Sequence, residues 1–173
     1  NEAKELTPWL KTLSKLNSKD GIYSILGNHD YGDYRSWSSE KKKIDNFNKI
    51  KQYQKDIGFN LLINQSKYIT RGNHKLAIVG VENWGNGFRK YGDLQKASEK
   101  IKSEDFKILL SHDPTHWQKK VLIDNANYQL TLSGHTHGGQ FGIEIPGYIK
   151  WSPVSWRYKY WAGIYKEKNK YIN

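Results

Sequence analysis

Residues 128–140, Tyr-Gln-Leu-Thr-Leu-Ser-Gly-His-Thr-His-Gly-Gly-Gln, place a polar loop directly after a short apolar segment. The segment 128–132 predicts a buried strand, which ends at Ser133 and Gly134. The loop that follows carries His135 and His137 among three glycines. In an open α/β sheet, the loops that leave the carboxyl ends of the strands line the active-site crevice. This stretch therefore predicts both an α/β sheet and the place of its functional site.

The same arrangement occurs at two earlier positions in the chain. Residues 22–26 predict a strand that leads into Gly-Asn-His-Asp at 27–30, and residues 106–110 predict a strand that leads into Ser-His-Asp-Pro at 111–114. Four of the six histidines fall in these three loops. We expect the three strand ends to converge on one site.

The rest of the chain alternates between helical and strand periodicity. Helices are predicted over 5–16, 38–57, 93–101 and 117–123, and further strands over 60–63, 67–70 and 75–81, with a hairpin turn at 71–74. A terminal hairpin is predicted from 162–165 and 171–172, with its turn at Lys168 and Asn169. These elements predict an α/β fold with mixed sheets flanked by helices, in a single domain over residues 1–173.

Composition excludes some classes of site and favours an anionic partner. The 173 residues contain no cysteine, which excludes disulfides, thiolate metal sites and a cysteine nucleophile. The 28 basic and 17 acidic residues give a net charge of +11, which favours phosphates, nucleic acid or acidic lipid headgroups. The lysines are scattered and no nucleic-acid-binding motif is present, so a nucleic-acid partner is not favoured.

The loop residues suit a divalent metal ion. Neutral imidazoles and an amide oxygen are ligands for Zn, Mn, Fe or Co. If residues 135–137 are extended, His135 and His137 point to opposite sides and serve two neighbouring ions; if they form a turn, both imidazoles reach one ion.

His29 beside Asp30 points to acid–base chemistry. A carboxylate that bonds to an imidazole sets its tautomer and raises its basicity, as a general acid for a leaving oxygen requires. The other reading of Gly-Asn-His-Asp is an ordinary turn.

Taken together, the three loops resemble the last three motifs of the calcineurin-like metallophosphoesterases, and Gly-His-Thr-His-Gly-Gly-Gln resembles a bacterial subgroup with N-terminal membrane or export segments. The resemblance implies a mixed-sheet sandwich, two divalent ions (Mn, Fe, Zn or Mg) and hydrolysis of a phosphomonoester, phosphodiester or pyrophosphate bond. It assigns Asn28, His112 and His135 to the second ion and His137 to the first. It places His29 beside the phosphate as the catalytic acid, with Asp30 orienting it.

The family pattern also includes an Asp-x-His and a Gly-Asp-x-x-Asp motif before Asn28, and neither is present in this chain. We therefore expect residues 1–173 to be the C-terminal portion of an enzyme domain. The alternative is a non-catalytic remnant that binds an anion or a partner and lacks the first metal site.

Two expectations concern surfaces. Loss of neighbouring strands would expose a sheet edge, which predicts self-association. The aromatic and basic stretch 150–161 predicts either a membrane-facing segment, with a lipid as substrate, or a loop packed on its own domain. The residues themselves do not assign a compartment, and only the resemblance implies a parent protein that is membrane-associated or exported.

Overall fold

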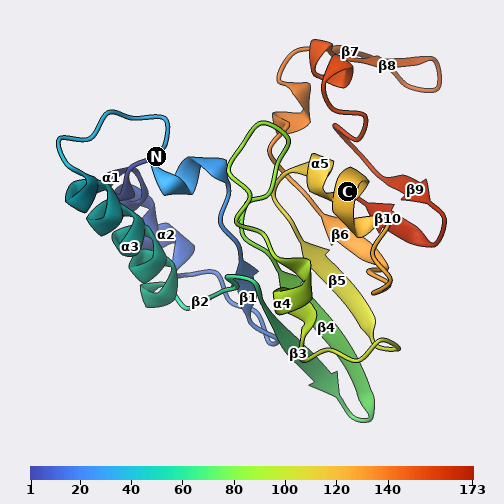
Figure 1. Cartoon of the computed structure of the whole chain (residues 1–173), viewed down its shortest axis with the longest axis horizontal. Coiled ribbons are helices and arrows are strands. Elements are labelled where there is room, and N and C mark those ends of the chain that lie inside the picture. Colours follow the sequence, from blue (N-terminus) through green and yellow to red (C-terminus); the bar gives the residue numbers. More distant parts are fainter.

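A six-stranded mixed sheet is the centre of the computed structural model, which describes residues 1–173 (Figure 1). Its strand order is β3-β4-β5-β6-β10-β9. The strands are β3 (Gln65–Arg71), β4 (His74–Gly80), β5 (Phe106–Leu110), β6 (Leu130–Leu132), β10 (Lys170–Ile172) and β9 (Tyr165–Glu167). The four inner strands are parallel, and β3 and β9 run antiparallel to them at the two edges. The predicted α/β class with mixed sheets is confirmed.

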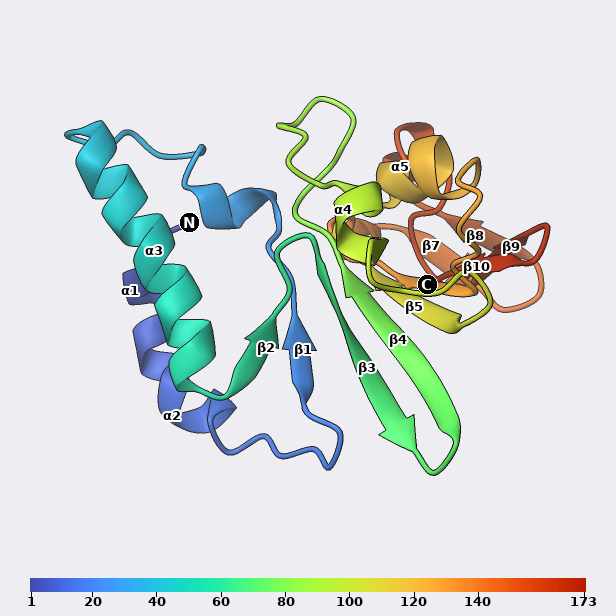
Figure 2. The same cartoon turned by 60° about the horizontal axis from the view of Figure 1, so that its bottom comes forward.

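One face of this sheet carries the main core. Ala77, Val79 and Val81 alternate along β4 and the residue after it, so their side chains point to the same face. That face is covered by α4 (Leu94–Ser98), α5 (Pro114–His116) and the π-helix η3 (Trp117–Val121) (Figure 2). Trp117 and Val121 of η3 are fully buried in the cluster. The predicted helix over 117–123 is therefore present, in a wider form that begins at Pro114.

The N-terminal part forms a smaller layer of its own. Strands β1 (Ile22–Ser24) and β2 (Phe59–Leu61) pair in parallel, and the helices α1 (Ala3–Leu6), η1 (Thr7–Trp9), α2 (Leu10–Leu13) and α3 (Glu40–Asp56) lie beside them (Figures 1 and 2). Ser39 begins α3 by accepting a hydrogen bond from Lys42 N. The predicted helix over 5–16 is broken into three short pieces, because Pro8 cannot donate the backbone hydrogen bond that a continuous helix needs.

The two layers meet at Gly80, the last residue of β4. A Cβ at this position would lie 2.3 Å from Leu62 Cβ and 3.0 Å from Ile25 Cγ2, so only glycine allows the approach. Leu62 and Leu26 are buried at this junction. The contact brings the carboxyl end of β1 beside those of β5 and β6. Strand β1 pairs only with β2, which leaves its other edge without a strand partner.

The C-terminal part contains two hairpins. The terminal one, β9–β10, is confirmed with Lys168 at its turn in a left-handed conformation (φ 55°). A second hairpin, β7 (Ile143–Ile145) with β8 (Ile149–Trp151), was not predicted and extends away from the rest of the molecule in Figure 1. Across the whole chain, every helix is too short or too polar to span a bilayer.

Candidate metal centre

Three donor atoms converge at the junction of the two layers. Asn28 Oδ1 lies 2.8 Å from His112 Nε2 and 3.1 Å from His135 Nδ1, and the two imidazole nitrogens are 3.3 Å apart. Ligands bonded at about 2.1 Å to one ion lie about 3.0–3.4 Å from each other, depending on the coordination geometry. The distances of 3.1 and 3.3 Å lie in this range, and the third, 2.8 Å, lies just below it, so the three atoms are close to the spacing that a single divalent ion requires.

Strand pairing explains why residues so distant in sequence meet. Asn28 begins the 3₁₀ helix η2 (Asn28–Tyr31) soon after β1, while His112 and His135 follow the neighbouring parallel strands β5 and β6. Gly134 N donates to His112 O at 2.9 Å, which holds the last two loops together. Gly27 is required at the approach, because a Cβ there would lie 2.8 Å from the His112 ring.

Residues 135–137 form a turn rather than an extended segment. His135 and His137 both have positive φ angles, 66° and 55°, with Thr136 at −78° between them. His137 begins the 3₁₀ helix η4 (His137–Gly139), and its Nδ1 lies 2.9 Å from Gln140 Nε2. The turn therefore joins His135, but not His137, to the three-donor group.

Electrostatics favour neutral imidazoles in this group. Burial, together with the charges of His135, His29 and His137, lowers the pKa of His112 to about 4. Burial also lowers the pKa of His135, and the nearby Asp113 opposes that shift. A neutral imidazole offers a lone pair, so the group is prepared for a cation at neutral pH.

The predicted pair of His29 and Asp30 is not formed. Asp30 Oδ2 accepts a hydrogen bond from Gly27 N at 2.7 Å, and burial raises the pKa of its carboxyl group. His29 instead stacks on Tyr34, with ring centroids 4.5 Å apart, and its Nδ1 lies 3.1 Å from Asn1 Oδ1. The reason is local: at the third position of η2, Asp30 reaches back to the free N–H before the helix.

Comparison with known proteins identifies the family. The family model described as calcineurin-like phosphoesterase matches residues 2–139. The chain belongs to this family. Its members are metal-dependent phosphoesterase hydrolases, and the ligand chemistry of the three-donor group agrees with that.

Three relatives illustrate the similarity. The putative metallophosphoesterase F40B5.2 of Caenorhabditis elegans is 31% identical over 147 residues, covering 78% of this chain and 27% of that protein. The phosphodiesterase YaeI of Escherichia coli is 29% identical over 152 residues (88% and 49%). A Bos taurus transmembrane protein with a metallophosphoesterase domain is 28% identical over 156 residues (86% and 33%). The chain spans half or less of the length of these relatives, and no solved structure matches it closely.

Two residues that the sequence did not assign to the site lie beside His135. His135 Nε2 lies 2.8 Å from Tyr158 Oη and 3.5 Å from Asp113 Oδ2. Asp113 follows His112 in one of the three predicted site loops, and this position is the only feature of the sequence that indicates a role in the site. Tyr158 had no signal beyond its place in an aromatic stretch.

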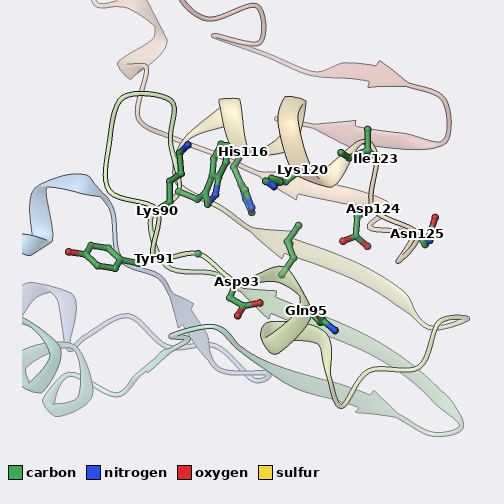
Figure 3. Close-up of a pocket in the computed structure, with 12 residues that line it drawn as sticks. Lys90, Tyr91, Asp93, Gln95, His116, Lys120, Ile123, Asp124 and Asn125 are labelled. Carbon is green, nitrogen blue, oxygen red and sulfur yellow. The ribbon is translucent and has the colours of Figure 1, made fainter.

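The chain's own ligands stop short of the family's two-metal set. No three side chains among its histidines, aspartates and glutamates gather as a metal-binding group, and the three-donor group depends on the amide of Asn28. A pocket of about 620 Å³ lies elsewhere, between α4 and η3 (Figure 3). It is lined by His116, Lys90 and Lys120 but by none of the predicted site residues.

Proposed function

We propose that the protein hydrolyses a phosphate ester, as a phosphomonoesterase, phosphodiesterase or pyrophosphatase with two divalent ions, and that this chain is the C-terminal portion of its catalytic domain. The observation that carries the proposal is the convergence of Asn28 Oδ1, His112 Nε2 and His135 Nδ1 within 2.8–3.3 Å of one another. Membership of a family of metal-dependent phosphoesterases supports a divalent ion at these atoms and a phosphate ester as the substrate.

In this proposal the three loops share the metal ligands and the acid. Asn28, His112 and His135 hold the second ion, and His137 binds the first. Bound ions supply the Lewis acidity that polarises the phosphate and activates water. His29 donates a proton to the leaving oxygen. Because its Nδ1 is paired with Asn1 Oδ1, Nε2 is the atom free to donate.

The second candidate is a non-catalytic module that binds an anion or a partner. It is favoured by the small number of metal ligands: His137 is the only residue of this chain that is assigned to the first ion, and no three side chains of His, Asp or Glu form a metal-binding group. The two candidates differ in whether the phosphate ester is hydrolysed. The enzyme releases product, whereas the module binds one ion and an anion and releases none.

Metal content and hydrolysis test the proposal. Elemental mass spectrometry after exchange into Zn²⁺ or Mn²⁺ should find at least one ion per chain. His135→Ala should lose that ion and the hydrolysis of bis-p-nitrophenyl phosphate together. His29→Ala should keep the ion and slow turnover, most for poor leaving groups. His74→Ala, which removes an exposed imidazole at the β3–β4 hairpin, should change neither. A wild-type chain without bound metal would contradict the metal site, and unchanged turnover in His29→Ala would contradict its catalytic role.

An anionic lipid bilayer is the surface partner we propose, with a lipid-borne phosphate ester as substrate. Tyr158 and Tyr160 of the aromatic stretch are buried, as the packed-loop reading expects, whereas Trp156 is 81% exposed. A larger exposed apolar face lies on β7–β8, where Ile143 pairs with Trp151 and Ile145 with Ile149.

Three further observations support this partner. Tyr148, at the tip of the β7–β8 hairpin, is 91% exposed, as suits an aromatic ring at headgroup depth. A pocket of about 390 Å³ at the base of the hairpin includes His137, so a surface bound there would lie beside the proposed site. The net charge of +11 complements an anionic membrane.

A further inference from the structure

Asp113 is a buried carboxylate with one oxygen left unpaired. Its side chain has no solvent exposure, and Oδ1 accepts hydrogen bonds from Thr115 N at 2.8 Å and Thr115 Oγ1 at 2.7 Å. Oδ2 has no hydrogen-bond partner. A buried carboxylate oxygen without a partner is costly, so its position calls for a physical reason.

Gly85 closes one side of Oδ2. A Cβ at Gly85 would lie 2.2 Å from Oδ2, so the backbone of this loop closes directly against the carboxylate. Three residues further on, the ring of Phe88 stands edge-on to His135, with centroids 5.0 Å apart. The carboxylate therefore faces His135 across a short gap, with Oδ2 3.5 Å from Nε2.

The proton on His135 decides whether this imidazole can bind an ion. To bind an ion together with Asn28 Oδ1 and His112 Nε2, Nδ1 must present a lone pair, and the proton must then sit on Nε2. Without an ion, the Asn28 oxygen accepts and favours a proton on Nδ1, so the Nε2 tautomer needs a partner of its own. Tyr158 Oη, 2.8 Å from Nε2, both donates and accepts, and it is compatible with either tautomer. An ionised carboxylate only accepts. Asp113 is thus the one neighbour of Nε2 that favours a single tautomer.

We propose that Asp113 is a positioning residue that holds the proton of His135 on Nε2 and so directs the Nδ1 lone pair toward the ion. The inference rests on the proposed function in that it assigns Nδ1 to a metal ion. Capping of α5 does not account for the residue, because that task needs only Oδ1 and asparagine caps a helix equally well.

Asp113→Asn tests the proposal with little change of shape. The amide keeps the cap through its oxygen and turns an NH₂ group toward Nε2, which then favours the proton on Nδ1. Partners in this position typically change metal affinity by 10–100-fold. We expect Zn²⁺ to bind about 10–100-fold more weakly to Asp113→Asn in calorimetric titration, while thermal unfolding of the metal-free protein stays at the wild-type temperature. Tyr158→Phe, the matched control, should lose less affinity than Asp113→Asn.

Two further measurements separate positioning from a structural role. In a His135→Ala background, where only Asn28 and His112 remain to bind Zn²⁺ weakly at high concentration, Asp113→Asn should cause no additional loss of Zn²⁺ affinity. In the metal-free chain with ¹⁵N-labelled histidine, Asp113→Asn should lower the share of His135 protonated at Nε2. The second readout needs no metal, so it tests the inference even where the proposed function fails. Zn²⁺ affinity within twofold of wild type, an equal loss in both backgrounds, or an unchanged tautomer would each overturn the inference.

Discussion

His116 should make the stability of the protein fall steeply in mild acid. Its side chain is 1% exposed, its Nδ1 pairs with Ser111 Oγ at 2.8 Å, and its ring lies 5.2 Å from that of Trp84 (the pocket in Figure 3). Burial, assisted by the charge of Lys120, lowers its pKa from 6.5 to about 4. The unfolded chain therefore binds a proton that the folded chain refuses between these two pH values.

The sign and size of the effect follow from proton linkage. Because the unfolded state holds more protons, the free energy of unfolding rises with pH across this window and is lost as pH falls. The full effect of His116 is about 3 kcal/mol, of which about 2 kcal/mol is already lost at pH 5. This is a large share of the stability of a typical domain, about 5–15 kcal/mol.

Urea unfolding followed by tryptophan fluorescence measures the effect, with EDTA present so that metal binding does not contribute. His116→Asn keeps a polar partner for Ser111 but does not titrate. Its free energy of unfolding should change between pH 7.5 and pH 5 by about 2 kcal/mol less than that of the wild type. If the two proteins lose equal stability over this interval, the assignment of a buried neutral imidazole is refuted.

Three other outcomes can be checked on the same protein. Gly80→Ala should destabilise it by about 1–3 kcal/mol or more in urea unfolding, because its Cβ would collide with Leu62, whereas Gly134→Ala, with no neighbour nearer than 3.7 Å, should cost less. Vesicles containing anionic lipid should sediment with the wild type and less with a variant carrying Ile145→Ser and Ile149→Ser; equal sedimentation would contradict a membrane-facing hairpin. The unpaired edge of β1 should make the chain associate, so a strictly monomeric species in light scattering would argue against that surface.

The sequence predicted the inner strands β4, β5 and β6 well because each is a short apolar run that ends at a polar or glycine-containing loop. The β3–β4 hairpin, with Gly72 in a left-handed turn, is a clear case. The β7–β8 hairpin was missed although Ile-Glu-Ile and Pro-Gly at 143–147 carry the alternation and the turn. A run of aromatic residues nearby suggested a loop, and no local pattern reveals that an apolar hairpin face stays exposed. The apolar periodicity over 5–16 predicted a continuous helix, but Pro8 has no backbone N–H to donate and the helix is interrupted there.

For the candidate site, chain order and the parallel pairing of β5 and β6 were sufficient to bring His112 and His135 together. The metal and catalytic roles remain predictions. The details that depend on unusual backbone angles could not be predicted. A positive φ at His135, uncommon for a residue with a side chain, turns its Nε2 toward Asp113 and Tyr158. The same kind of angle at His137 pairs that residue with Gln140.

The junction at Gly80 has a consequence for how this chain can change over generations. Asn28 Oδ1 of the three-donor group follows the small β1–β2 layer, whereas the two imidazole nitrogens follow strands of the large sheet. The distances among these atoms therefore depend on the relative position of the two layers. Adding or removing one methylene at Leu62 would shift the two layers relative to each other, although Leu62 lies outside the loops that carry the metal ligands. Neither layer can therefore drift alone. We expect substitutions at this contact to be tolerated only in matched pairs that restore the fit of the two layers.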